Sequence, residues 1–580
     1  MKKQLLYLLA IAVVFLFSCT KDFEKINTNP SSFISAQPDA VLPGVFLNTI
    51  NRFEQNNLTW LWEYGHIVNP LGRYNVGDDG VWNSLYVNVL GNTRQLLKLF
   101  EGKEGYTNRV AITDIWECYV YANLVGTYGP VPYSHMGETD KTSIEYDTEN
   151  DIYTSILSRL KKDAAAISLT GDKFTGDPIF NGDMSKWIKF ANSLRLRTAL
   201  TVQINLPDLA ASNIKELMSN ESILLTSDAD NVKFSYGSAT GSQSFYFRQL
   251  VLGNSYVGNA YPYMSDYVFT YFRSFKDPRI ESYFSKATSP YNITDTLKSS
   301  SNALNYIVSY PIPHLGQPKS GAKLPSWDFT SATNPTGFAP FNGANGLQGN
   351  FSKPQSALFA ADRPFYIMTF AELCFMKAEA SVKGFGGSQS AEAYYNAGVN
   401  ANFSFWGHTS AQAATYLSQN GIKWGTSGKG FNYPYGFINV GISADNLKKI
   451  WIQQWLNYYV DGGFESWVLQ RRTQNLELPT HTSPGAIAGL TTIFENLPDR
   501  FPYPIQAESV LNPVGYANGV KMLGGPDFYS TKLKFQTPYT SVDWTKKIAF
   551  LDETVAQKWY GQYIEDLTAA GIKYTVLRTF

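Results

Sequence analysis

Residues 366–380 read Tyr-Ile-Met-Thr-Phe-Ala-Glu-Leu-Cys-Phe-Met-Lys-Ala-Glu-Ala, and this stretch decides the class of fold. Its apolar residues recur at the three- and four-residue spacing of one helical face. They are Tyr366, Phe370, Leu373, Met376 and Ala380. Arg363-Pro364 precedes the stretch as a start signal, and Gly384 follows it as a stop signal. We therefore expect an amphipathic helix that begins near Pro364 and ends at Gly384.

Other segments share this helical periodicity and carry their own capping or breaking residues. The signals are the capping box Thr148-Glu149-Asn150-Asp151, the caps Asp183, Ser390 and Ser443, and the breaker Gly126–Pro130 after residues 112–125. Successive helices joined by turns predict a mainly α fold of irregular, tetratricopeptide-like helix pairs, although no clean 34-residue repeat is visible. Cys118 and Cys374 each lie in such a helical run, so we expect buried thiols and no disulfide between them.

The chain changes character at residues 225–362 and 475–550, which are rich in Gly, Ser, Asn, Pro and aromatic residues. Long stretches of this kind are functional or pack irregularly. We interpret both as loop-rich insertions of a single helical domain spanning residues 36–580.

The N-terminus carries the features of an export signal. Lys2 and Lys3 precede the apolar run Leu5–Phe17, whose 13 residues are too few to cross a ~30 Å bilayer core as a helix. The run ends in Leu16-Phe17-Ser18-Cys19, which resembles a bacterial lipobox. We expect residues 1–18 to be a lipoprotein signal peptide, Cys19 to be lipidated, and residues 19–35 to form a tether. An ordinary cleavable signal with a chance cysteine is the alternative.

Composition narrows the classes of function. Without Lys2 and Lys3, 46 basic and 48 acidic residues remain, a net charge of −2, which disfavours binding to nucleic acid. Aromatic residues make up 15% of the chain and include 13 Trp and 37 Tyr. Rings of this kind suit stacking on half-apolar ligands such as sugars.

Catalytic signatures are missing from the sequence. The five histidines show no metalloprotease pair at i and i+4, and no Gly-x-Ser-x-Gly elbow occurs. Glu372 and Glu379 lie on one helical face, where we expect them to bond arginines or helix ends. Arg471-Arg472 is interpreted in the same way, as a clamp on carboxylates or carbonyls. We expect neither enzymatic activity nor a cofactor or metal.

Two groups of loop residues combine rings with polar side chains that could bind sugar hydroxyls. The first group is Arg73, Tyr74, Asn75, Asp78, Asp79 and Trp82. The second group, within the first insertion, includes Tyr261, Tyr263 and Trp327. Trp82 has two equal interpretations, a platform on which a sugar ring stacks or a side chain that caps the core. Asp78-Asp79 before Gly80 also fits a simple turn.

Several stretches recur in one order from end to end and together resemble the SusD/RagB family of nutrient-binding outer-membrane lipoproteins. They are Cys19 with Asp22–Asn27; Gly129–Ser134; Asn181–Trp187 with Phe190–Arg197; Asp277–Arg279; Tyr366–Ala380; Tyr394–Val399; Glu465–Trp467 with Arg471–Thr473; and Arg500–Pro504 with Glu508 and Asn512. The sequence departs from the pattern at Gln474, where glycine is frequent, and in the tail 552–580.

The resemblance implies a tetratricopeptide-like fold that lies as a lid over a SusC-like TonB-dependent transporter of the outer membrane. It also implies capture of oligosaccharides, and the loop after the first helix often supplies ligand contacts in that family. We therefore expect a lipid-anchored, surface-exposed glycan-binding protein. Binding of peptides or another nutrient on the same scaffold is the alternative, and a lipid-anchored glycoside hydrolase is a remote one.

Overall fold

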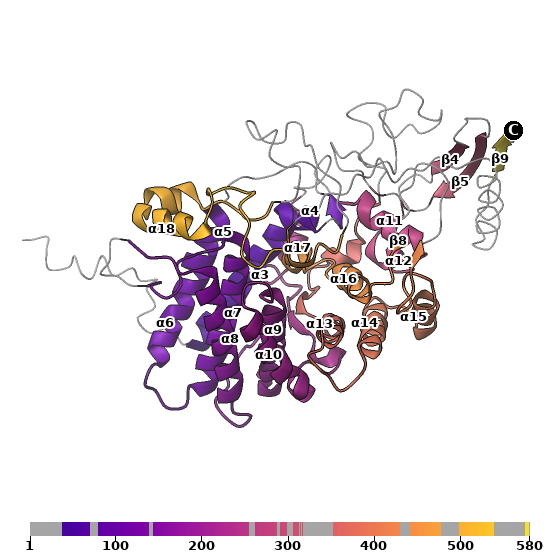
Figure 1. Cartoon of the computed structure of the whole chain (residues 1–580). Helices are drawn as coiled ribbons and strands as arrows, with labels where there is room; N and C mark the ends of the chain where they lie inside the picture. Colours follow the sequence, from indigo (N-terminus) through magenta and orange to yellow (C-terminus); the bar gives the residue numbers. More distant parts are fainter. Residues whose placement is uncertain are drawn as a thin grey trace, which may run out of the picture.

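Helices form the main body of the protein, as Figure 1 shows for the computed structural model. The model describes residues 38–65, 67–69, 79–137, 143–253, 262–286, 291–298, 305–312, 314, 316, 352–429, 441–476, 498–538 and 575–578. The helices are α3 (Pro38–Asn56), α4 (Trp62–Tyr64), α5 (Asp79–Asn83), α6 (Gly91–Phe100), α7 (Thr107–Tyr128), α8 (Glu149–Ala166), α9 (Met184–Thr201), α10 (Pro207–Ser219), α11 (Asp266–Ser274), α12 (Ile280–Tyr283), α13 (Phe370–Val382), α14 (Ala391–Phe405), α15 (Ser410–Leu417), α16 (Asn446–Asn457), α17 (Gly463–Thr473) and α18 (Pro513–Leu523).

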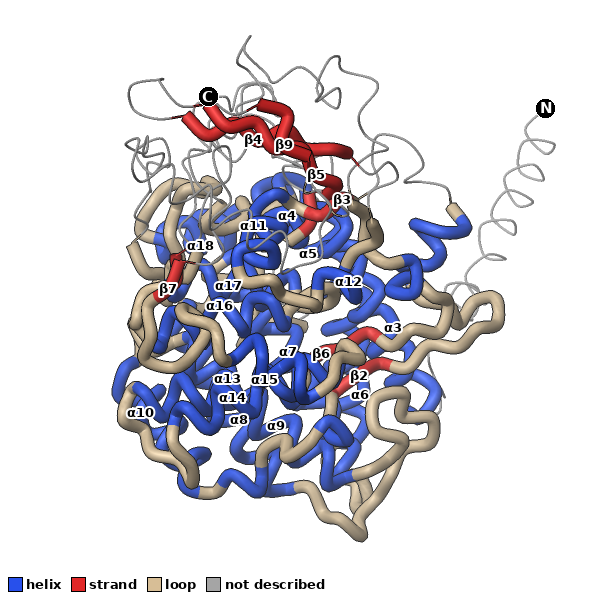
Figure 2. Tube along the Cα trace, turned by 90° about the vertical axis from the view of Figure 1, so that its right-hand side faces the viewer, coloured by secondary structure: helices blue, strands red, loops and turns tan. Residues whose placement is uncertain are grey.

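Shorter helical turns and small sheets complete the described structure. The turns are η1 (Asn57–Leu61), η2 (Ser84–Leu90), η3 (Glu221–Ile223), η4 (Asp228–Asp230), η5 (Phe247–Leu252), η7 (Ser356–Phe359) and η8 (Ile505–Val510). The strands are β1 (Val68–Asn69), β2 (Val232–Phe234), β3 (Tyr263–Met264), β4 (Tyr291–Lys298), β5 (Asn305–Ile312), β6 (Phe365–Met368), β7 (Gly428–Lys429), β8 (Gly441–Ile442) and β9 (Thr575–Arg578). Figure 2 shows helices throughout the body, with β4, β5 and β9 gathered at its upper edge.

Neighbouring helices pack in sequence order, as the predicted helix pairs require. Helix α7 packs against α8, α8 against α9, and α9 against α10. In the second half of the chain, α13 packs against α14 and α16, and α14 against α15. Contacts between α9 and α13 join the two halves. The mainly α, tetratricopeptide-like architecture is confirmed.

Three of the predicted helix starts are confirmed by their capping hydrogen bonds. The Thr148 hydroxyl accepts from the Asp151 amide, Asp183 accepts from two amides of α9, and the Ser390 hydroxyl accepts from the Ala393 amide. Each side chain satisfies amides that have no partner inside the first helical turn. The predicted cap at Ser443 is displaced, because Asp445 caps α16 instead.

The stretch that opened the sequence analysis divides into a strand and a helix. Residues Phe365–Met368 form β6, which pairs antiparallel with β2, so the prediction of a helix from Pro364 is wrong. Helix α13 begins at Phe370, where the Thr369 hydroxyl accepts from the Glu372 amide. Helix α13 ends at Val382, and Gly384 follows in a left-handed conformation with φ +79°. The predicted stop is therefore confirmed.

Two further details of the sequence find a physical explanation. Gln474 ends α17 with φ +52° and ψ +41°, the left-handed conformation that glycine adopts without strain. A glycine at this position would therefore fit the backbone without strain. Cys118 and Cys374 are both buried and free, as predicted, and burial raises the pKa of each thiol.

Among the described helices, none combines the length and the apolar character that a membrane crossing requires.

Candidate functional site

The short sheet formed by β1 and β3 joins two points of the chain that lie next to candidate residues in the sequence. Val68 pairs with Met264, and Asn69 pairs with Tyr263. Because the pair is antiparallel, the end of β1 at Asn69 lies beside the start of β3 at Tyr263. In the sequence, Arg73 follows the first of these residues and Tyr261 precedes the second. They are almost 200 residues apart in the sequence.

Most of the candidate residues lie outside the described part of the chain, so their roles stay predictions. These residues are Arg73, Tyr74, Asn75, Asp78, Tyr261 and Trp327. Asp79 is the first residue of α5, and only its backbone is described. Cys19 and the tether also lie outside the described residues.

Trp82 lies in the core. Its side chain is 3% exposed, and its ring centroid lies 4.7 Å from that of Tyr86 and 5.0 Å from that of Tyr128. Tyr503 packs edge-on against it at 6.0 Å. Helix α5 turns the indole inward onto these rings, so the interpretation as an exposed stacking platform does not fit this structure. The alternative, core packing, does.

Tyr263 is likewise buried rather than presented to a ligand. It is 1% exposed in β3, and the Lys353 ammonium lies 5.8 Å from its ring centroid. A cation at this position interacts favourably with the ring face. Tyr263 therefore supports the base of the candidate loops, and its prediction as a ligand contact does not fit this burial.

The hydroxyl groups of three tyrosines that pack around Trp82 form hydrogen bonds within the core. The hydroxyl of Tyr86 donates to the Pro132 carbonyl at 2.9 Å, and that of Tyr503 donates to the Pro130 carbonyl at 2.6 Å. The hydroxyl of Tyr146 donates to Glu508 at 2.6 Å. These hydrogen bonds were not predicted from the sequence. The stretches 129–134 and 500–504, which carry the family resemblance, supply the two carbonyls and Tyr503.

A comparison with family models reveals a match along most of the chain. The model described as starch-binding and associating with the outer membrane, SusD-like, covers residues 39–307 and 328–504. The chain belongs to the SusD-like family.

Solved structures that resemble this SusD-like protein show the same fold. A chitin-binding SusD homologue from Flavobacterium johnsoniae is 21% identical with a TM-score of 0.66, over 87% of this chain and 99% of that one. A SusD homologue from Bacteroides vulgatus is 23% identical with a TM-score of 0.63, over 85% of this chain and 98% of that one. No curated protein sequence matches the chain.

Glu372 and Glu379, the two carboxylates on one helical face, are both held in ion pairs in this SusD-like protein. Arg197 donates to both oxygens of Glu372 at 2.8 and 2.7 Å, and Arg472 donates to both oxygens of Glu379 at 2.7 and 2.8 Å. Burial raises the pKa of Glu379, but Arg472 and Lys383 outweigh it and hold that pKa well below its usual range. The predicted structural role of both glutamates is confirmed.

Arg471 binds two backbone carbonyls, as the predicted clamp requires. Its guanidinium donates to the Gly126 carbonyl and to the Asp499 carbonyl, each at 2.8 Å, and lies 3.4 Å from the centre of the Trp467 ring. Burial without a direct carboxylate partner lowers the pKa of Arg471 to about 9. Arg471 thus joins α17 to the end of α7 and to the segment that precedes η8.

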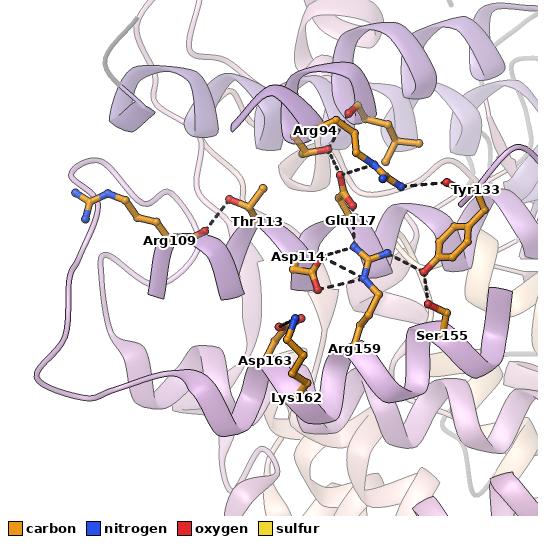
Figure 3. A network of polar contacts seen from close by, with 12 residues as sticks. Arg94, Arg109, Thr113, Asp114, Glu117, Tyr133, Ser155, Arg159, Lys162 and Asp163 are labelled. Atoms are coloured by element: carbon orange, nitrogen blue, oxygen red, sulfur yellow. Dashed lines mark hydrogen bonds and ion pairs between the residues drawn. The ribbon is translucent and has the colours of Figure 1, made fainter. Parts of the chain in front are cut away.

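A second polar network links α6, α7 and α8, as Figure 3 shows. Arg159 donates to Asp114, to Glu117 at 2.7 Å and to the Tyr133 hydroxyl at 2.8 Å. Burial and a hydrogen bond with Asp114 raise the pKa of the nearby Asp163 to about 9. The carboxylates of Asp114 and Glu117 point toward Arg159, and these ion pairs link α7 to α8. Within the described ranges, no group of three or more His, Cys, Asp or Glu side chains could hold a metal ion.

Proposed function

We propose that this SusD-like protein is a lipid-anchored nutrient-binding protein of the cell surface that captures an oligosaccharide for a SusC-like TonB-dependent transporter. The observation that supports the proposal is the β1–β3 pair, in which Asn69 lies beside Tyr263. Two stretches that are rich in rings and polar groups therefore join this sheet at the same end.

The chemistry of these loops favours a neutral sugar. Arg73, Asn75 and Asp78 offer a guanidinium, an amide and a carboxylate to ligand hydroxyls, while Tyr74 and Tyr261 offer flat rings for apolar sugar faces. A net charge of −2 for the chain without Lys2 and Lys3 supplies no strong field for a charged ligand. A resembling structure is named as chitin-binding, which supports a glycan as the ligand class.

Replacing Arg73 or Asp78 with alanine should weaken glycan binding by about 1–3 kcal/mol, the usual loss when a charged hydrogen-bonding partner is removed. Thermal unfolding should be unchanged, since the proposed partners are sugar hydroxyls. Titration calorimetry against a panel of oligosaccharides and peptides measures the effect. Lys161→Ala is the matched control, because its ammonium is 58% exposed and pairs with Glu216 on the surface of the helical body.

Two outcomes of that panel would contradict the proposal. Unchanged affinity in both variants would exclude the loop 70–78 as the site, and tight binding of peptides alone would change the ligand class. The glycans should also be recovered intact after incubation. Turnover that disappears when one carboxylate is mutated would instead make the protein a hydrolase.

Replacing Cys19 with alanine should release the protein from the membrane fraction. Each buried acyl methylene contributes about 0.8 kcal/mol to the free energy of membrane binding. The lipid chains of a mature lipoprotein therefore hold the protein firmly on a bilayer. Fractionation of cells lacking the transporter, followed by immunoblotting, measures the effect. Ser18→Ala keeps a small residue before the cysteine and serves as the control. Sedimentation of the Cys19→Ala variant with outer membranes would refute the anchor.

A further inference from the structure

The segment formed by η8 and α18 exposes aliphatic side chains to solvent. Ile505 is 74% exposed, Val510 56%, Leu511 69% and Val514 60%. Pro513 and Ala517 are exposed on the same segment. We call these six residues the η8–α18 surface. Of the exposed residues between 505 and 521, only Lys521 is charged.

The same segment also holds two buried polar side chains. Glu508 is 6% exposed and accepts from the Tyr146 hydroxyl at 2.6 Å. Asn512 is 8% exposed and donates to the Ile144 carbonyl at 3.0 Å. Val520 and Leu523 pack against the core, so folding of the single chain leaves only part of the segment's apolar side chains in water.

Close packing fixes the segment in this orientation. A Cβ atom at Gly519 would lie 2.3 Å from the Tyr146 ring, and one at Gly515 would lie 2.1 Å from the Ile144 carbonyl. Only glycine allows so close an approach. Rotation of α18 that buried Leu511 or Val514 would bring side chains into these two contacts. The outward position of the aliphatic side chains is thus built into the packing.

The size and charge of the surface identify the kind of partner. The four aliphatic side chains expose on the order of 400 Å², the size of the largest apolar patch on an ordinary monomer, and such patches are often functional. Two copies paired through this surface would bury about 800 Å² in total, below the ~1,200–2,000 Å² of a stable interface. A bilayer contact is disfavoured as well, because segments that lie on membranes carry basic residues and Trp around the apolar face.

The position of the surface beside the candidate site favours a partner that receives the ligand. Turn η8 contacts α5, the helix that begins where the candidate loop 70–78 ends. Glu508 of η8 accepts from Tyr146, whose ring lies 6.3 Å from that of Trp82 in α5. A protein docked on the η8–α18 surface would therefore lie next to α5, which follows the candidate loop in the sequence.

We propose that the η8–α18 surface is the apolar centre of the interface with the outer-membrane transporter, an inference that rests on the proposed function. The partner should present an apolar area of similar size, surrounded by polar groups, on its extracellular side. Docking there buries aliphatic side chains that the single chain leaves in water, and it joins the transporter to the same base that supports the ligand loops.

The test uses the full lipidated chain, expressed together with its transporter and extracted in detergent. The double variant Leu511→Asp/Val514→Asp should reduce the amount of co-purified transporter at least tenfold, because it places two carboxylates in an apolar interface. Leu169→Asp is the matched control, since Leu169 is 60% exposed in the turn that follows α8. Glycan affinity of the soluble form should be the same in wild type, control and double variant.

The outcomes separate this inference from the proposed function. Transporter that still co-purifies with the double variant would overturn the assignment of the surface alone. Wild-type protein that never co-purifies with the transporter would overturn the proposed partnership together with this assignment. The soluble Cys19→Ala form should be monomeric in light scattering and should not bind vesicles of outer-membrane lipid. A dimer, or vesicle binding, that the double variant abolishes would assign the surface to a second copy or to lipid and overturn the proposal.

Discussion

Replacing Asp277 with alanine should lower the free energy of unfolding by about 3–5 kcal/mol, the effect of leaving one member of a buried ion pair without its partner. Asp277 and Arg279 are 1% and 0% exposed at their side chains, and Arg279 Nε lies 3.0 and 3.1 Å from the two carboxylate oxygens. The guanidinium also donates to Asn402 at 2.7 Å and to Gln453 at 2.9 Å. Neither of these neutral groups can replace the lost charge.

The buried arginine explains why the effect should be large. Burial lowers the pKa of the Arg279 guanidinium, but the adjacent Asp277 carboxylate raises it by more, so the cation persists inside the protein. Rings of Phe403 and Tyr416 lie 4.8 and 5.1 Å from it and exclude water. Asp277→Ala would leave this cation without a carboxylate in an apolar enclosure.

Denaturant unfolding measures the Asp277 effect, with Lys161→Ala as the control. The Lys161–Glu216 pair joins side chains that are 58% and 43% exposed, and exposed pairs contribute about 0–1 kcal/mol. Asp277→Asn should lie between the control and Asp277→Ala, because it removes the charge and keeps an acceptor. An Asp277→Ala variant as stable as the Lys161→Ala control would show that the pair adds nothing to stability.

Replacing Trp82 with alanine should lower the free energy of unfolding by about 3–5 kcal/mol, the range for a large aromatic side chain removed from a core. The 3% exposed indole packs against Tyr86, Tyr128, Tyr146 and Tyr503, so its removal leaves a cavity among rings that cannot close over it. Glycan affinity should fall only as far as the base of the candidate loop is disturbed.

A paired measurement on each variant distinguishes a core residue from a ligand contact. Trp82→Ala should unfold at a lower temperature, whereas Arg73→Ala should unfold with the wild type and bind glycan more weakly. Trp82→Phe restores most of the buried area and should recover most of the stability. Wild-type stability combined with lost glycan binding in Trp82→Ala would instead support the stacking platform.

Local signals explain what the sequence predicted well. Thr148, Asp183 and Ser390 cap their helices through amides no more than three residues away, so the determinants of each helix start lie within one turn of sequence. The left-handed residue after α13 is recognisable for the same reason, because glycine at position 384 adopts it without strain. Glu372 and Glu379 were also interpreted correctly, since a carboxylate on an apolar helix face requires a cationic partner.

Long-range pairing explains what the sequence could not predict. Residues 365–368 have helical spacing, yet they form a strand because β2, over 130 residues earlier, offers an edge. Strands β1 and β3 have two residues each, too few for any alternating pattern, although they pair across almost 200 residues of sequence. Trp82 could be assigned to the core only after the positions of Tyr128 and Tyr503 were known.

The two interior thiols make the chain well suited to spectroscopic labelling. Cys118 and Cys374 are buried, and burial raises the pKa of Cys374 to about 12 and that of Cys118 further, so little reactive thiolate exists at neutral pH. With Cys19 replaced, a maleimide probe would attach to a cysteine introduced at Val510 in preference to either native thiol. Nitroxide or fluorescent reporters could then follow the approach of a detergent-solubilised partner without replacement of Cys118 or Cys374.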